Sequence, residues 1–379
     1  MGVLSALMNA LKGQTDPHAD AAVQDYQQAQ PEVRALLEQG MRQGSTQTIG
    51  LPESFKRLLQ DSEVAVSNVP AAAFELAMQP YSWIGPTWIS MVLGPGSLAH
   101  TYSDPGIAAV LMRTGNLLTQ TVSRRLLETQ LWKISVIKPG GMGVGGAGYV
   151  NTLQVRLLHA RVRATLIQRG WSSPDGQQAV PIDQWQMLRT WLDFTVVPFE
   201  AFDRIGFTLT DEQTQGLYEA WRMVGHLLGI DSTLLSKVTD QAVARELLTI
   251  VDGQLPKPDE NSQTLTHAML AALGNRLAPV LKYPADVSAM LMASLCRLFH
   301  GDELADELGV QSNWTAALLP MMADANRFRF RRLTEDPAYR ESVQEQSIKA
   351  FDAIVTGFPD EAIYQAMAKS LATTELPSL

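Results

Sequence analysis

The sequence contains one cysteine, Cys296, so no disulfide can form within the chain and no cysteine-based zinc site is available. No run of about 18 apolar residues is free of helix breakers, because Pro86, Gly94 and Pro95 interrupt the most apolar stretch, residues 81–99. The first residues lack the basic segment and cleavage site of a signal peptide. We therefore expect a cytoplasmic protein without a membrane span, for which peripheral membrane contact is conceivable.

Positive charge is also scarce. The chain has 30 Lys and Arg against 39 Asp and Glu, a net charge of −9, and its basic residues adjoin only in pairs. Nucleic acid is therefore excluded as a partner. The six histidines form no HExxH or Glu-x-x-His motif, and GxSxG is absent. These absences argue against a zinc protease, a ferritin-like di-iron protein and an α/β-hydrolase.

A helical pattern runs through nearly the whole sequence. Helix starts are predicted at Pro17, Pro31 and Pro52, because proline suits the first turn of a helix, and apolar residues recur every three or four positions in residues 107–135. No convincing strand alternation occurs, so the predicted fold class is all-α.

We expect one large helical domain. Residues 1–15 are predicted to be a flexible or amphipathic N-terminus and residues 16–379 a single all-α domain, with a core at about 100–250 and C-terminal helices at 263–379. The length would also allow several domains, but the best candidate boundary, the proline-containing linker 252–262, is short.

One glycine-rich segment, KPGGMGVGGAG at residues 138–148, contains GxGxxG. A dinucleotide site would need a strand before it and an acidic residue about 20 positions later. A short strand at residues 134–137 is conceivable, but no Asp or Glu occurs between Gly148 and Asp175. We interpret the segment as a turn that permits close backbone approach.

His159 lies among leucines and valines in VRLLHARVR, with Arg156 three residues before it and Arg163 four residues after it. On a helix these three side chains lie near one another. A neutral imidazole can bind haem iron, and arginines can pair with haem propionates. A histidine that is simply packed is the commoner explanation of such a pattern.

Arg125, Glu128 and Thr129 occupy one face of one turn in RRLLETQLW. A surface ion pair between Arg125 and Glu128 is the simplest interpretation. The surrounding leucines and Trp132 nevertheless leave little room for a fully exposed helix. A buried Glu128 that lacked compensation would have a raised pKa and could exchange protons near neutral pH.

Several sequence blocks, taken in their order along the chain, resemble those of the latex-clearing protein family. These are the rubber oxygenases, which share a catalytic domain with the MpaB oxygenases. The resemblance covers about residues 15–310 and is carried by DPHADAAVQDY, RRLLETQLW, the glycine-rich segment, VRLLHARVR and PIDQWQMLRTWLDFTVVPFEAFDRIG. It implies an all-helical fold with a globin-like core, a b-type haem, and dioxygen-dependent cleavage of an isoprenoid carbon–carbon double bond into carbonyl ends.

The resemblance also implies residue roles. His159 matches the proximal iron ligand, Arg125 and Thr129 match distal residues, and Arg156 and Arg163 match arginines of the ligand helix. Two positions depart from the family. Glu128 replaces a distal lysine, and the family's catalytic acid falls near Ala109, where the neighbouring carboxylate is Asp104.

The leading hypothesis is a haem b oxygenase that uses O2 on a hydrophobic substrate, with isoprenoids as one candidate class. Catalysis is assigned to Glu128, Arg125 and Thr129, with Glu128 as the acid–base group, and haem binding to His159, Arg156 and Arg163. Two alternatives remain open: a haem-binding sensor, carrier or peroxidase-like protein without alkene cleavage, and a helical lipid- or prenyl-binding protein without haem.

Overall fold

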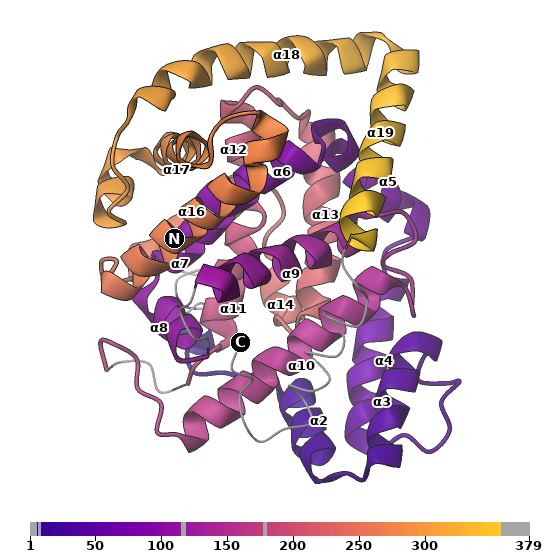
Figure 1. Ribbon diagram of the computed structural model, residues 1–379. Coiled ribbons are helices and arrows are strands. Elements are labelled where there is room, and N and C mark those ends of the chain that lie inside the picture. Colours follow the sequence, from indigo (N-terminus) through magenta and orange to yellow (C-terminus); the bar gives the residue numbers. More distant parts are fainter. Residues whose placement is uncertain (1–5, 7–8, 115–118, 177–179, 358–379) are drawn as a thin grey trace.

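The computed structural model describes residue 6 and residues 9–114, 119–176 and 180–357, and the regular elements within these residues are helices (Figure 1). The predicted all-α class is confirmed. None of these helices is both long and apolar enough to span a bilayer.

The first half of the chain forms short and medium helices followed by one long pair. They are α2 (Pro17–Gln28), α3 (Pro31–Gln43), α4 (Glu53–Ser67), α5 (Ala71–Ile84), α6 (Pro86–Val92), the π-helix η1 (Leu93–Leu98), α7 (Ala99–Tyr102), α8 (Pro105–Thr114), α9 (Thr119–Ile137) and α10 (Ala147–Gln168).

The second half contributes further helices that surround and cover this pair. They are α11 (Gln184–Asp193), α12 (Val196–Arg204), α13 (Asp211–Leu227), α14 (Ser232–Leu235), α15 (Gln241–Asp252), α16 (Glu260–Leu281), α17 (Ala285–Glu307), the 3-10 helix η2 (Trp314–Leu318), α18 (Leu319–Glu335) and α19 (Pro337–Thr356).

Capping chemistry explains many of the helix starts. The Asp16 side chain accepts the backbone N–H of Ala19 at 3.2 Å, and Pro17 then opens α2. Thr210 and Gln213 form a capping box at the start of α13. The starts predicted at Pro17 and Pro31 are confirmed, and Pro52 directly precedes α4.

Two local predictions were wrong. Residues 134–137, considered as a strand, form the last turn of α9, because their buried apolar side chains continue the core-facing side of that helix. The pattern at residues 107–135 belongs to two helices, α8 and α9, rather than to one. Pro198 lies in the first turn of α12, where a missing N–H costs little.

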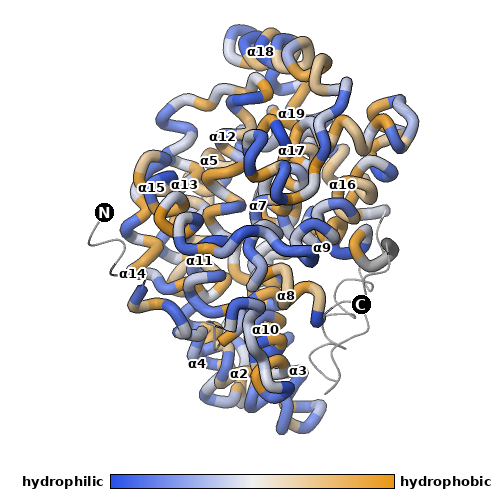
Figure 2. Tube along the Cα trace, turned by 90° about the vertical axis from the view of Figure 1, so that its left-hand side faces the viewer, coloured by the Kyte–Doolittle hydropathy of each residue, from blue (hydrophilic) through white to orange (hydrophobic). Residues whose placement is uncertain are grey.

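The layers place α9 and α10 in the middle of the molecule. Helices α2, α3 and α4 lie at one end beside α10, while α18 crosses the opposite end (Figure 1). The side view shows the same two ends, and hydrophilic and hydrophobic stretches alternate along the chain, as expected of amphipathic helices (Figure 2). One large apolar cluster fills the interior, and a small separate one joins Val110 of α8 to Val162 and Leu166 of α10.

The glycine-rich segment is the turn that reverses the chain between α9 and α10. Gly140 and Gly145 have positive φ angles of 73° and 82°, and the N–H of Tyr149 donates to the carbonyl of Gly141 at 3.0 Å. A Cβ on Gly148 would lie 2.5 Å from the Ser135 carbonyl oxygen, so the two helices can approach this closely only at a glycine. The predicted turn is confirmed, and helices flank it on both sides.

Replacing Gly148 by alanine should separate the two helices. We expect Gly148→Ala to lower the free energy of unfolding by about 1–3 kcal/mol through overpacking. Gly143→Ala, in the same turn, places its Cβ where no atom lies within 4 Å, and should change it by less than about 0.5 kcal/mol. Urea unfolding followed by circular dichroism compares the two variants, and equal midpoints would contradict this account of the turn.

Candidate functional site

The two long helices form an antiparallel hairpin with a defined register. The indole Nε1 of Trp132 donates to Thr152 Oγ1 at 3.0 Å across the hairpin. Arg125 lies seven residues before Trp132, and His159 lies seven residues after Thr152. Seven residues make almost two full turns. Arg125 therefore lies on the same side of α9 as Trp132, and His159 lies on the same side of α10 as Thr152. The two residues thus lie on facing sides, about two turns further from the glycine-rich turn than the Trp132–Thr152 contact. There the helices diverge, with α8 near the open end (Figure 1).

His159 combines the features expected of a neutral ligand. Its Nδ1 atom is buried and has no hydrogen-bond partner within the part of the chain that the structure describes, although the residue as a whole is only half-buried. Burial, assisted by the charge of Arg163, lowers the pKa of the imidazole to about 4, so the ring is neutral at physiological pH. A buried polar atom without a partner is rare, and a bound metal or hydrogen-bonding ligand would satisfy it.

The packing beside His159 is also unusual. The small cluster of Val110, Val162 and Leu166, flanked by the half-buried Leu158, is separate from the main core. These residues pack beside His159 on its α8 side as a group of their own. A neutral imidazole beside such a group fits the predicted haem ligand. Within the described ranges, no group of three or more His, Cys, Asp or Glu side chains is arranged to hold a metal ion.

Arg125 reaches from α9 to the end of α8. Its Nη1 donates to the carbonyl of Leu111 at 3.3 Å and its Nη2 to Thr114 Oγ1 at 3.2 Å. Thr129, one turn later, donates its hydroxyl to the carbonyl of Arg125 at 2.9 Å. These contacts fix the Arg125 guanidinium to a second helix, on the side of α9 that faces His159.

Tyr102 is a further polar residue beside Arg125, and no motif in the sequence points to it. Burial raises the pKa of its phenol to about 12, and the nearby charge of Arg125 opposes that rise. The hydroxyl therefore keeps its proton at neutral pH. The sequence around Tyr102 does not reveal this contact, because Arg125 lies 23 residues further along the chain.

Glu128 pairs with Arg124, whereas the sequence suggested Arg125 as its partner. Its carboxylate accepts the Nε of Arg124 at 2.9 Å, one turn back along α9, and both side chains are partly exposed. The surface ion pair considered for this turn therefore exists, with Arg124 in place of Arg125. An acid–base role for Glu128 stays a prediction, and it would require the carboxylate to leave Arg124.

Asp104, the carboxylate nearest the position of the family's catalytic acid, serves as a helix cap. It accepts the N–H groups of Gly106 at 2.7 Å and Ile107 at 3.3 Å, at the start of α8. Burial raises the pKa of this carboxyl group. Its oxygen is thus committed to the backbone of α8.

Arg156 belongs to a buried ion network. Its Nε and Nη2 donate to the two oxygens of Asp16 at 2.6 and 3.0 Å, and its Nη1 donates to Asp61 at 3.0 Å. His226 of α13 binds the other oxygen of Asp61 at 3.0 Å. Burial alone would raise the pKa of Asp61, but His226 and Arg156 lower it to about 2. One guanidinium thereby attaches the start of α2 and α4 to α10, and His226 joins α13 to them through Asp61.

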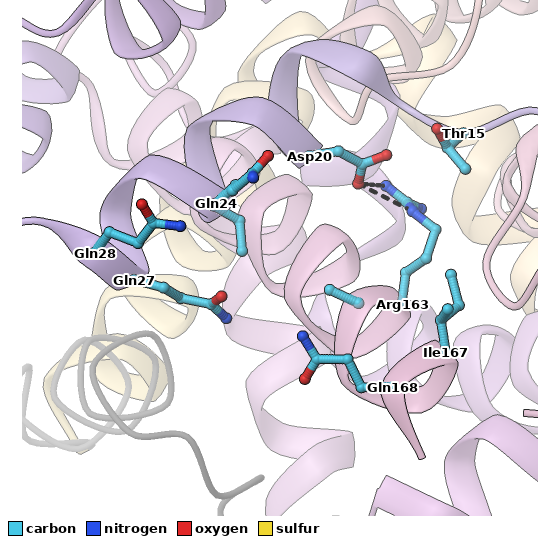
Figure 3. Close-up of a pocket in the computed structure, with 10 residues that line it drawn as sticks. Thr15, Asp20, Gln24, Gln27, Gln28, Arg163, Ile167 and Gln168 are labelled. Atoms are coloured by element: carbon cyan, nitrogen blue, oxygen red, sulfur yellow. Dashed lines mark hydrogen bonds and ion pairs between the residues drawn. The ribbon is translucent and has the colours of Figure 1, made fainter. Parts of the chain in front are cut away.

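Arg163 is held in the same way almost two turns later. Its Nε and Nη2 donate to Asp20 of α2 at 3.0 and 2.6 Å, and its Nη1 to the carbonyl of Ile182 at 2.6 Å. Beside this pair a cavity of about 380 Å³ opens between α2 and α10, with Gln24, Gln27 and Gln28 along its α2 wall (Figure 3). His159 is not among the residues that line it.

The predicted propionate contacts of Arg156 and Arg163 stay predictions. In the structure both guanidinium groups bind aspartates of the N-terminal helices. Their observed contribution is to fix the rotation of α10 on either side of His159.

A second buried polar cluster lies at the π-helix. His100 Nδ1 contacts Asp193 at 2.7 Å, and its Nε2 lies 3.3 Å from Asp252. Arg189 pairs with both aspartates, at 3.1 and 3.3 Å. Burial disfavours the charged ring of His100, but the two carboxylates raise its pKa to about 9. This cluster joins α7, α11 and α15 through compensated charges.

Residues 82–333 match the family described as ER-bound oxygenase mpaB/B'/Rubber oxygenase, catalytic domain, and the chain belongs to this family. The family match identifies these helices as an oxygenase-type catalytic domain.

Two known proteins are similar to the chain. A rubber oxygenase of Streptomyces sp. (strain K30) is 24% identical over 284 residues, which is 74% of this chain and 66% of that protein. The solved structure of latex clearing protein LCP in the closed state superposes with a TM-score of 0.66 at 21% identity, covering 89% of this chain and 90% of that one. The suspected resemblance is thus confirmed for the family and for the fold.

Removing Arg156 should strongly destabilise the protein. Arg156→Ala leaves the carboxylates of Asp16 and Asp61 buried without their partner, so we expect a loss of about 3–5 kcal/mol in unfolding free energy. Arg57→Ala, which breaks an exposed pair with Glu53, should cost at most about 1 kcal/mol. Chemical denaturation of both variants measures the difference, and similar losses would show that the network does not hold α10.

Proposed function

We propose that the protein is a haem b-dependent oxygenase that acts with O2 on a hydrophobic substrate, by oxidation or by cleavage of a carbon–carbon double bond. Isoprenoid compounds are the candidate substrate class. The observation that carries the proposal is the neutral imidazole of His159, whose Nδ1 is buried without a partner opposite Arg125. Membership of the mpaB and rubber oxygenase family supports the reaction type.

His159 would hold the haem iron, at the centre of a globin-like core built from α8, α9 and α10. When bound, the haem supplies an iron centre that can activate dioxygen. The low pKa of His159 favours this role, because the ring needs no deprotonation before it binds a metal. The ion pairs of Arg156 and Arg163 keep α10 from rotating, which fixes the direction of the imidazole.

Arg125 and Thr129 would form the opposite side of the site. A guanidinium that is anchored to α8 by Leu111 and Thr114 is already in position to stabilise negative charge that develops on an oxygen. The Tyr102 phenol beside it is a second hydrogen-bond donor at neutral pH. Glu128 remains a proposed acid–base group, subject to its release from Arg124.

Removing the imidazole should abolish haem binding. We expect His159→Ala to lose the Soret band and the b-type pyridine haemochrome of the purified protein, while its helical circular dichroism is retained. The exposed His267 of α16 provides the control, because His267→Ala should keep full haem content.

Three outcomes would contradict the proposal. Full haem content in His159→Ala would show that another residue binds the iron. A wild-type protein that stays colourless and takes up no added haemin would favour a helical binder of apolar ligands. A haem protein that consumes no O2 with any isoprenoid alkene would leave a sensor or carrier.

Arg125 should affect turnover without affecting haem content. Arg125→Gln keeps hydrogen-bonding capacity towards α8 but removes the positive charge. We expect O2 consumption with an isoprenoid alkene to fall by about 10²–10³-fold, the range seen when one charge-stabilising donor is removed. Arg222→Gln, a half-buried arginine of α13 that binds the Val238 carbonyl, is the matched control. Equal rates in the two variants would remove Arg125 from the reaction.

A further inference from the structure

Lys133 is buried in the middle of α9, and no acidic partner for it is found among the residues that the structure describes. Only 2% of its surface is accessible. In contrast to the buried Arg156 and Arg189, it forms no ion pair, and no hydrogen bond of its amine is found in the described part of the chain. An uncompensated amine in a protein interior is costly, and such residues concentrate where chemistry needs them.

Three aromatic rings surround the amine instead. The Nζ atom lies 5.0 Å from the ring centre of Tyr81, 5.1 Å from that of Trp221 and 5.7 Å from that of Phe194. Tyr81 and Trp221 are themselves joined by a hydrogen bond of 3.2 Å. The faces of aromatic rings attract a cation. They stabilise the ammonium less than a carboxylate would, and they cannot accept its proton.

Burial without a carboxylate lowers the pKa of Lys133 to about 7. The amine therefore exchanges its proton near neutral pH, where a general base is most effective. The titratable group that faces it from the packed helices is the Tyr81 phenol, which stays protonated because burial raises its pKa.

The position of Lys133 connects it to the proposed oxygenase site. Arg125, Thr129 and Lys133 follow one another at four-residue intervals, so they form one slowly winding row along α9. Helical side chains lean towards the N-terminus of their helix, so the stem of Lys133 is expected to lean towards the turn that carries Thr129, while its amine lies among the three rings. The carboxylate of Glu128 lies off this row and is paired with Arg124.

We propose that Lys133, rather than Glu128, is the proton acceptor of the site, a role that rests on the oxygenase function proposed above. The lone pair of Nζ takes a proton from the substrate, so that an N–H bond forms while the electrons of the broken bond remain on the substrate. The resulting ammonium is held by the three aromatic faces and later returns its proton to the product or to water.

The first test is the pH dependence of turnover by the haem-loaded protein. We expect the kcat/KM of the wild type for an isoprenoid alkene to fall about tenfold per pH unit below pH 7, as the amine becomes protonated. Lys133→Met should lower kcat by about 10²-fold and lose this acidic limb. Lys237→Met, at an exposed lysine, should retain both rate and limb. A limb that survives in Lys133→Met but disappears in Glu128→Gln would overturn the proposal.

The second test needs no turnover. Between pH 7 and the ordinary lysine pKa of 10.5, the unfolded chain binds a proton that folded Lys133 does not, so this residue makes the wild type more stable as pH rises. Lys133→Met should therefore have the higher Tm at pH 7, and the difference should shrink towards pH 10. A pH-independent difference would show an amine with an ordinary pKa and would overturn the proposal.

The two tests separate this inference from the proposed function. A wild-type protein without haem or O2 uptake contradicts the oxygenase and its proton acceptor together, even if the stability difference follows pH as expected. An active haem protein whose pH profile is unchanged in Lys133→Met contradicts the role of Lys133 alone.

Discussion

The guanidinium of Arg156 is the contact on which the arrangement of the site depends. It is almost completely buried, and it joins α10 to Asp16 at the start of α2 and to Asp61 of α4. The chain also passes very close to this pair at Gly229, where a Cβ would lie 2.0 Å from Asp16. A buried ion pair of this kind contributes less to stability than to choosing one arrangement over others. Here it selects the rotation of α10, and therefore the direction of His159 three residues later.

In this rotation, two sides of α10 contact different neighbours. Arg156 and Arg163 face the aspartates of α2, while Val162 and Leu166 face α8. His159 lies between these sides, close enough to the Arg163 charge to lose basicity and without a carboxylate hydrogen-bonded to its ring. The same residue pattern that resembles a haem-ligand motif thus has a physical consequence in this fold, which is an imidazole kept neutral.

The helices and their caps could be predicted because the signals are local: Asp16 with Pro17, and Thr210 with Gln213, act within one turn. The partners of charged side chains could not. Glu128 has an arginine three and four residues before it, and only the packed helix decides that Arg124 is the one it binds. The motif resemblance proposed roles for Arg156 and Arg163, but it did not indicate that Asp16, Asp61 and Asp20 bind their guanidinium groups.

Lys133 shows the same limit more clearly. In sequence it is one lysine in an apolar helix, and its environment arises only when Tyr81, Phe194 and Trp221 arrive from three other segments. The protein treats its buried cations in two ways. Where a fixed charge serves packing, as at Arg156, carboxylates compensate it. On α9, by contrast, no carboxylate among the residues that the structure describes pairs with Lys133 to lower the cost of its charge. The result is an interior in which structural groups are ionised while His159 and Lys133 can be neutral, which is the state that ligand binding and proton transfer require.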